Sequence, residues 1–205
     1  MSGHSAHAVR RWSLAFALCT LPSLVMAQAP RRPVSVGLGG GGTVPIGDFA
    51  DDVKTGPHIL GFLQYQPAIG PWAVRGEVMY SRARYTDKFL DDDDVGATRG
   101  DDLSSGVLFG GASALYTGGR RNGGVSPYVI GGLGLYRLTA TLKDDSGTSV
   151  SRSENGFGFN GGAGVRFGGS LGVFVEARFH QFSITPERGP KATSQLIPVS
   201  LGFSF

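Results

Sequence analysis

Apolar and polar residues alternate one by one in short segments along most of the chain. The clearest segment is 196–205, where from residue 197 onward every odd-numbered residue is apolar and the even-numbered residues are small or polar: Ile197, Val199, Leu201, Phe203 and Phe205 against Pro198, Ser200, Gly202 and Ser204. A period of two is typical of a β-strand with one apolar and one polar face. This end of the chain is therefore predicted to be a strand.

Eight such segments follow one another, which predicts a protein built almost entirely of strands. They cover 34–42, 58–66, 72–82, 105–116, 128–139, 157–167, 171–182 and 196–205. In the fifth segment Tyr128 and Tyr136 are eight residues apart and share a face. We interpret that face as the apolar one, with the two tyrosines at the two edges of an apolar band.

The connections between these segments alternate between long and short. The long ones are 43–57, 83–104, 140–156 and 183–195, and the short ones are 67–71, 117–125 and 168–170. In an up-and-down antiparallel sheet all long connections then lie at one end. Short turns at one end and long loops at the other are typical of outer-membrane barrels.

Acidic residues follow the same division. Of 16 Asp and Glu residues, 14 lie in the long connections, and Glu77 and Glu176 lie on polar faces of strands. A charge that faces lipid at the bilayer midplane costs about 2–4 kcal/mol, so a lipid-facing surface requires this placement.

Composition supports a β protein. The chain has 34 glycines in 205 residues, and glycine costs a helix interior about 1 kcal/mol relative to alanine. We interpret the strand glycines as permitting tight curvature and leaving room for inward Arg and Glu side chains.

Residues 1–27 are predicted to be a signal peptide. Arg10 and Arg11 precede an apolar run, 12–26, that ends in small residues, with cleavage expected after Ala27 or Ala29. Residues 28–205 then form one domain. Without the two arginines the chain has 17 basic and 16 acidic residues, so nothing in its charge favours nucleic-acid binding.

The terminal stretch 197–205 resembles the last strand of bacterial outer-membrane barrels, which ends in Phe and is read by the barrel-assembly machinery. With 127–134 (PYVIGGLG), the chain resembles the OmpA/OmpX-type eight-stranded family over 34–205. The resemblance implies a closed, up-and-down antiparallel transmembrane β-barrel in contact with outer-membrane lipid and lipopolysaccharide, with Phe203 and Phe205 in the assembly signal. Ser200 departs from the family, which more often has Gly there.

Eight strands enclose a lumen that side chains can fill. The polar faces of the strands supply a candidate lumen network: Arg75, Glu77, Arg166, Glu176, Arg178 and His180. We expect its charges to be paired, because an unpaired buried charge is very costly. We expect His180 to hydrogen-bond Glu176 or Arg178. A narrow ion path is the alternative to a closed, structural or surface-interacting barrel, which we expect to be a monomer.

Two other functions are open. His180, Ser183 and Glu187 invite comparison with outer-membrane enzymes that modify lipid A, although no such motif is present. A soluble, lipocalin-like periplasmic barrel would turn its apolar face inward and place Arg75, Glu77, Glu176 and Arg178 in water outside.

The second long connection contains a weak candidate for a divalent-ion loop, formed by Asp91, Asp93 and Asp102. A solvated acidic loop is the simpler interpretation.

The tripeptide 99–101 (RGD) is of the integrin-binding type but is expected by chance. With no cysteine and two histidines after the signal peptide, zinc has no ligand set, and we expect neither a metal nor a cofactor.

Overall fold

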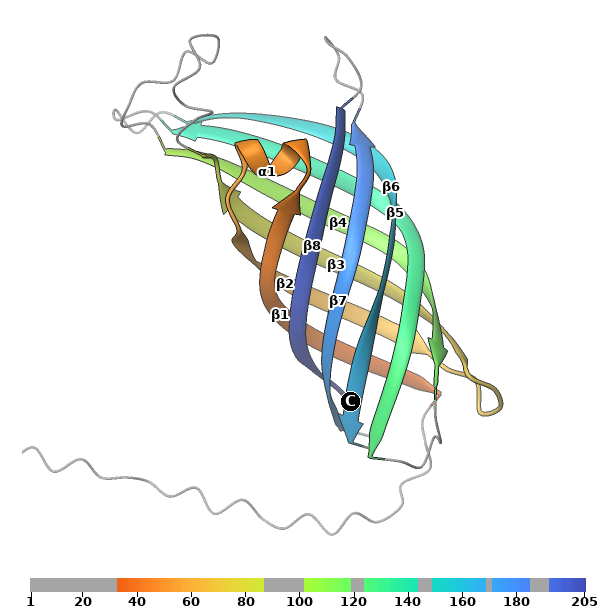
Figure 1. The fold of residues 1–205 in the computed structure, drawn as a ribbon. Helices are drawn as coiled ribbons and strands as arrows, with labels where there is room; N and C mark the ends of the chain where they lie inside the picture. The colour runs from red at the N-terminus through yellow and green to blue at the C-terminus, as the bar shows by residue number, and fades with distance from the viewer. Residues whose placement is uncertain (1–32, 87–101, 119–123, 144–148, 169–170, 185–191) are drawn as a thin grey trace, which may run out of the picture. The chain divides into compact units, whose positions relative to one another are not determined.

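The computed structural model describes residues 33–86, 102–118, 124–143, 149–168, 171–184 and 192–205. It contains eight strands and one short helix (Figure 1): β1 (Val34–Ile46), α1 (Asp48–Asp52), β2 (Gly56–Tyr65), β3 (Trp72–Arg84), β4 (Asp102–Thr117), β5 (Val125–Lys143), β6 (Ser149–Gly168), β7 (Gly172–Ile184) and β8 (Ala192–Ser204). Within these ranges no helix is long and apolar enough to cross a membrane.

The strands form a closed antiparallel barrel in which each pairs with its neighbours in sequence and β8 pairs with β1. The predicted fold class is therefore confirmed. Near the start of β1 and the end of β8, Val36 and Phe205 exchange two backbone hydrogen bonds of 2.8 and 2.9 Å, which complete the closure of the barrel. We call this the turn end, since the short connections lie there, and the opposite end, which carries α1, the loop end (Figure 1).

The strands are longer than predicted at the loop end. Strands β5 and β6 take up most of the segment 140–156 that we expected to be a loop, and they pair as far as Lys143 and Ser149. Hydroxyl pairs link them there, Thr139 to Ser153 at 2.9 Å and Thr141 to Ser151 at 3.0 Å. A strand made of polar residues on its outer face lacks the apolar alternation on which our boundaries relied. Helix α1, within the segment expected as the first loop, was also missed.

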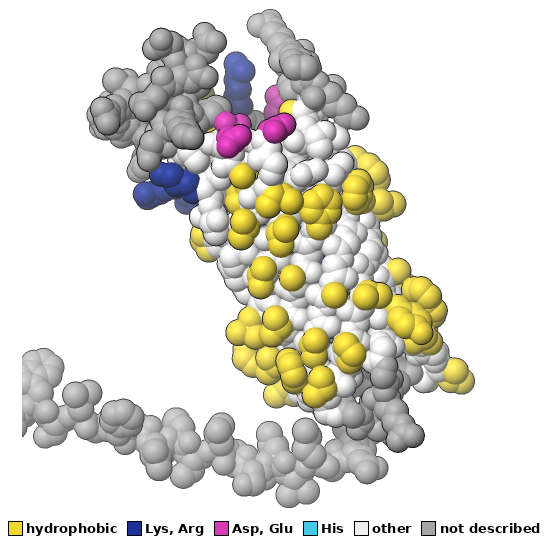
Figure 2. Space-filling view, viewed as in Figure 1, with side chains coloured by type: hydrophobic (Ala, Val, Ile, Leu, Met, Phe, Trp, Pro, Cys, Tyr) yellow, Lys and Arg dark blue, Asp and Glu magenta, His cyan; other side chains and the backbone are white. Residues whose placement is uncertain are grey.

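The outer wall carries the apolar faces predicted for the third, sixth, seventh and eighth segments. Figure 2 shows hydrophobic side chains over the wall and charged ones at the loop end. Exposed residues include Val74, Val78, Phe157, Val175 and Phe203. The lipocalin-like alternative is wrong, because it requires these residues to be inside.

The orientation predicted for Tyr128 and Tyr136 is wrong. Both side chains point into the lumen, where they are 7% and 1% exposed. The opposite face of β5 carries Val129, Leu133 and Leu135, which are exposed. Both faces of this strand are apolar, so hydropathy could not decide which one faces outward. At the turn end an aromatic pair does face outward, with the rings of Trp72 and Tyr116 5.1 Å apart.

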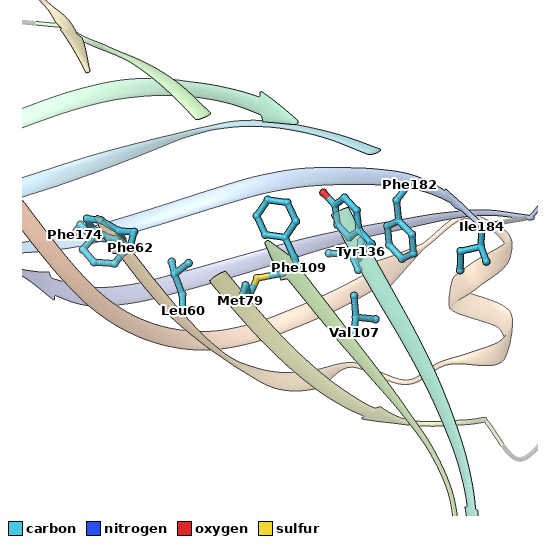
Figure 3. Close-up of a cluster of buried hydrophobic side chains, with 10 residues drawn as sticks. Leu60, Phe62, Met79, Val107, Phe109, Tyr136, Phe174, Phe182 and Ile184 are labelled. Atoms are coloured by element: carbon cyan, nitrogen blue, oxygen red, sulfur yellow. The ribbon is translucent and has the colours of Figure 1, made fainter. Parts of the chain in front are cut away.

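The lumen is filled by side chains. Its larger apolar cluster runs from Phe62 and Phe174 to Phe182 and Ile184 (Figure 3). A smaller cluster consists of Ala73, Leu115, Tyr128 and Ile130. Glycines on the inner wall make space for these rings: a Cβ on Gly164 would lie 2.5 Å from the Tyr128 ring. At this position glycine accommodates an aromatic side chain rather than an Arg or Glu.

The lumen network as candidate functional site

Two strands on opposite sides of the barrel supply the fully buried Arg and Glu residues of the described part of the chain. Strands β3 and β7 are four strands apart in either direction around the closed sheet. Both run from the turn end to the loop end, and alternation places every second side chain inside. The inward charges of β3 are Arg75 then Glu77, and those of β7 are Glu176 then Arg178. The order of the signs is reversed, so each level of the lumen has one cation and one anion.

These four residues form what we call the ion layer. Arg75 donates from Nη1 to Oε2 of Glu176 at 2.8 Å. Arg178 donates from Nη1 to Oε1 of Glu77 at 2.7 Å, and its Nη2 also pairs with Oε2 of that carboxylate. A third ion pair joins the two levels, from Arg178 Nε to Glu176 Oε1 at 2.7 Å. The layer carries no net charge and connects opposite walls of the barrel.

Neutral groups complete the coordination of these ions. Gln64 accepts from Nε and Nη2 of Arg75 at 3.2 and 3.0 Å, and the Arg75 guanidinium lies 4.0 Å from the centre of the Phe62 ring. Tyr128 donates to Glu176 Oε2 at 2.7 Å, and Ser113 donates to Glu77 Oε1 at 2.7 Å. All four ions are at most 5% exposed. Charge-assisted and two-pronged Arg–carboxylate bonds are the strong ones, as such burial requires.

The next level toward the loop end is what we call the aromatic layer, formed by Phe109, Tyr136, His180 and Phe182. Tyr136 stacks on Phe182 with ring centres 4.4 Å apart, and Phe109 meets the His180 ring edge-on at 5.1 Å. His180 Nδ1 is 2.8 Å from the Tyr136 hydroxyl. The expected partner of His180 was therefore wrong, because the inward turn of Tyr136 brings its hydroxyl within hydrogen-bond distance of the imidazole.

The other predicted residues lie elsewhere. Arg166 is only partly buried and lies on β6 near the turn end, where it pairs in register with Phe174. His180 points inward and Ser183, three residues along the same strand, points outward. His180 and Ser183 therefore do not act together in the way that the comparison with lipid A enzymes suggested. Glu187, the third residue of that set, lies outside the described residues. So do Asp91, Asp93 and the tripeptide 99–101, and of Asp102 only the backbone is described.

A second polar chain was not predicted. The imidazole of His58 lies between Thr43 Oγ1, 3.0 Å from Nδ1, and Ser200 Oγ, 2.8 Å from Nε2. It links β1, β2 and β8 across the strands that close the barrel, and it gives Ser200 a role that glycine could not have. A serine bonded to a histidine is also how a nucleophile is activated, but here the third member is a neutral threonine, and all three are buried.

Comparison with known proteins agrees with this architecture. The family model for the outer membrane protein beta-barrel domain matches residues 13–205. The chain belongs to this family. It is thus an outer-membrane barrel, and the predicted location is confirmed.

Solved structures share the fold of this outer-membrane barrel at low sequence identity. Neisserial surface protein A is 16% identical with a TM-score of 0.54, and the match covers 84% of this chain and 96% of that one. A major outer membrane protein from Thermus thermophilus is 12% identical with a TM-score of 0.56, covering 85% and 99%. No curated protein sequence matches the chain.

Proposed function

We propose that this protein is a closed structural barrel of the outer membrane, which presents its loop end to the cell exterior for surface contacts and catalyses no reaction. The ion layer carries the proposal. It fills the cross-section between β3 and β7 with paired charges, and the apolar clusters lie on both sides of it along these strands. A hydrated ion that passed through would have to separate buried ion pairs, which is costly.

Conductance across a planar lipid bilayer tests the closed lumen. We expect the wild-type barrel to give no stable conductance step. A Glu77→Ala/Arg178→Ala variant removes one level of the ion layer and should give small, brief openings. Val78→Ala, which shortens an outward side chain on the same strand, is the control and should behave as wild type. Large and stable steps from the wild-type protein would refute the proposal.

Outward arginines near the loop end support contact with the anionic headgroups of lipopolysaccharide. Arg82 and Arg84 on β3 and Arg137 on β5 are exposed, and their positions alternate with buried inward neighbours such as Ser81 and Tyr136. Three acidic residues in the strands have described side chains: Glu77, Glu154 and Glu176. None of them shares this outward face. The outward charges of the described strand residues near the loop end are therefore basic.

Binding of purified lipopolysaccharide measures this contact. Replacing Arg82, Arg84 and Arg137 together with Gln should weaken binding at low salt several-fold, while a single Lys54→Gln variant serves as a control for loss of one exposed charge outside the strands. Equal binding by the triple variant and the wild type would exclude these arginines as the contact.

A further inference from the structure

The outer wall has a broad depression at the turn end of β4 to β7. Its volume is about 620 Å³, within the range of roughly 300–1,000 Å³ found for small-molecule sites. The lining residues are almost all apolar: Tyr116, Gly118, Pro127, Tyr128, Val129, Ala163, Gly164, Val165, Val175 and Ala177.

Strand register explains the depression. Tyr116, Val129, Ala163 and Ala177 are successive partners across four strands and form one outward row. Two alanines stand side by side in this row, whereas large apolar side chains occupy most of the outer wall. The next row toward the loop end contains Gly131 beside Gly161, so it is low as well.

Larger side chains border this low region. Toward the turn end the bordering residues are Pro127, Val165 and Val175. Toward the loop end Phe159 and Phe179 lie against each other with ring centres 6.4 Å apart. The result is a trough in the wall that runs across the strands. Tyr116, whose ring packs against Trp72, stands at its β4 side.

We propose that this trough binds one acyl chain of a phospholipid in the leaflet that surrounds the turn end. As the chain belongs to an outer-membrane family, this wall contacts lipid. The hydroxyl of Tyr128 points into the lumen, so the lining offers a ligand no hydrogen-bonding side chain except the Tyr116 hydroxyl at its edge. In the orientation proposed above, the leaflet is the periplasmic one.

The shape of the trough argues against a protein partner. A second barrel presents a convex wall, which would rest on the bordering Val and Phe side chains and leave the alanines uncovered. A flexible hydrocarbon chain is thin enough to reach them. Each methylene group that packs there replaces contact with mobile neighbouring chains by contact with a fixed surface, so the gain comes from close packing rather than from transfer out of water.

Native mass spectrometry of the delipidated full-length barrel, incubated with palmitoyl-oleoyl phosphatidylethanolamine, tests the site. We expect the wild type to retain one phospholipid at concentrations where Ala163→Leu/Ala177→Leu retains at least five-fold less. Ala112→Leu is the matched control, an outward alanine on β4 outside the trough, and should bind as wild type does. The heat-modifiability gel shift verifies that every variant is folded, which is expected because both alanines face lipid.

Competition identifies what is recognised. A single-chain lysophospholipid should displace the bound lipid, and glycerophosphoethanolamine, which has the headgroup alone, should not. Equal retention by the double variant, displacement by the headgroup, or a paired barrel in place of a lipid adduct would each overturn the proposal. Conductance of the same samples reports on the lumen independently, so a conducting barrel that binds the lipid would refute the closed lumen and leave the trough intact.

Discussion

The ion layer and the aromatic layer occupy neighbouring levels of the same lumen, yet their side chains depend on their neighbours differently. In the ion layer each charge is tolerable only because a specific opposite charge lies within hydrogen-bond distance. In the aromatic layer the contacts are ring against ring, and the contribution of each ring follows from the volume it fills. The stability of the ion layer therefore depends on which charges are paired, while that of the aromatic layer depends on how well the rings fill the space.

The largest test of this difference is Arg178→Ala. It leaves Glu77 and Glu176 buried without their shared cation, and we expect the free energy of unfolding to fall by about 3–5 kcal/mol. Urea unfolding in lipid vesicles, followed by the gel shift, measures the loss. Adding Glu77→Gln to this variant should restore much of it, since Glu176 still pairs with Arg75 and no unpaired carboxylate then remains. A loss that this addition leaves unchanged would mean that packing, rather than charge, holds this layer.

Removing a ring from the aromatic layer is expected to give the second-largest loss of stability. Phe182→Ala opens a cavity beside Tyr136 and should cost about 3 kcal/mol by the same unfolding assay. No change at another residue is expected to recover the loss unless it refills the volume. Phe179→Ala, on the outward face of the same strand, should cost much less because lipid fills the space. Equal losses from the two variants would contradict a packed lumen.

Two Tyr→Phe substitutions, each removing one hydroxyl oxygen, compare the stability contributed by hydrogen bonds in the two layers. Tyr128→Phe deletes a hydroxyl that donates to the Glu176 carboxylate and should cost about 1.5–3 kcal/mol. Tyr136→Phe deletes one that is hydrogen-bonded to the ring of His180 rather than to a carboxylate and should cost about 0.5–1.5 kcal/mol. Guanidinium unfolding of the two variants side by side ranks them, and the reverse order would show that the charge of Glu176 is screened in the lumen.

The smallest effect is expected outside the lumen, in α1. Burial, and then repulsion from Asp51 and Asp48, raises the pKa of Asp52. A raised pKa in the folded state means that the local stability is greatest at low pH and decreases as pH rises through that pKa. Asp52→Asn should therefore increase amide protection at Val53 and Thr86 at pH 7 and leave it unchanged at pH 3. Hydrogen exchange, corrected for intrinsic rates, measures this difference. Equal protection in both proteins at pH 7 would contradict it.

The residues of the ion layer could be predicted from sequence because the charges on each of its two strands alternate with apolar residues. Arg75 and Glu77 alternate with Val74 and Val78, so their direction follows from hydropathy alone. Which charge meets which depends on how β3 and β7 are placed across the barrel. That placement is the sum of the registers of the four strand pairs between them, and alternation within one strand contains none of this information.

The aromatic layer could not be predicted for the opposite reason. Strand β5 is apolar on both faces, and either could have faced the lipid. The choice is made by packing, since the inner positions of β5 are opposite Phe109 and His180, where a tyrosine ring and its hydroxyl both find partners. For the same reason the partner of His180 was not foreseen. The trough likewise depends on two alanines from different strands meeting in register.

The reversed order of charges on β3 and β7 has a consequence for how the barrel is assembled. Strands can slip by two residues and keep their faces, so hydropathy alone does not penalise such an error. A slip of that size at any ladder between β3 and β7 moves one strand by about 7 Å relative to the other. It would place Arg75 at the level of Arg178, or Glu77 at the level of Glu176. Two like charges buried close together in the lumen are strongly unfavourable. Both halves of the circumference must therefore set the same relative register of β3 and β7, because a barrel of the wrong shear brings like charges to one level.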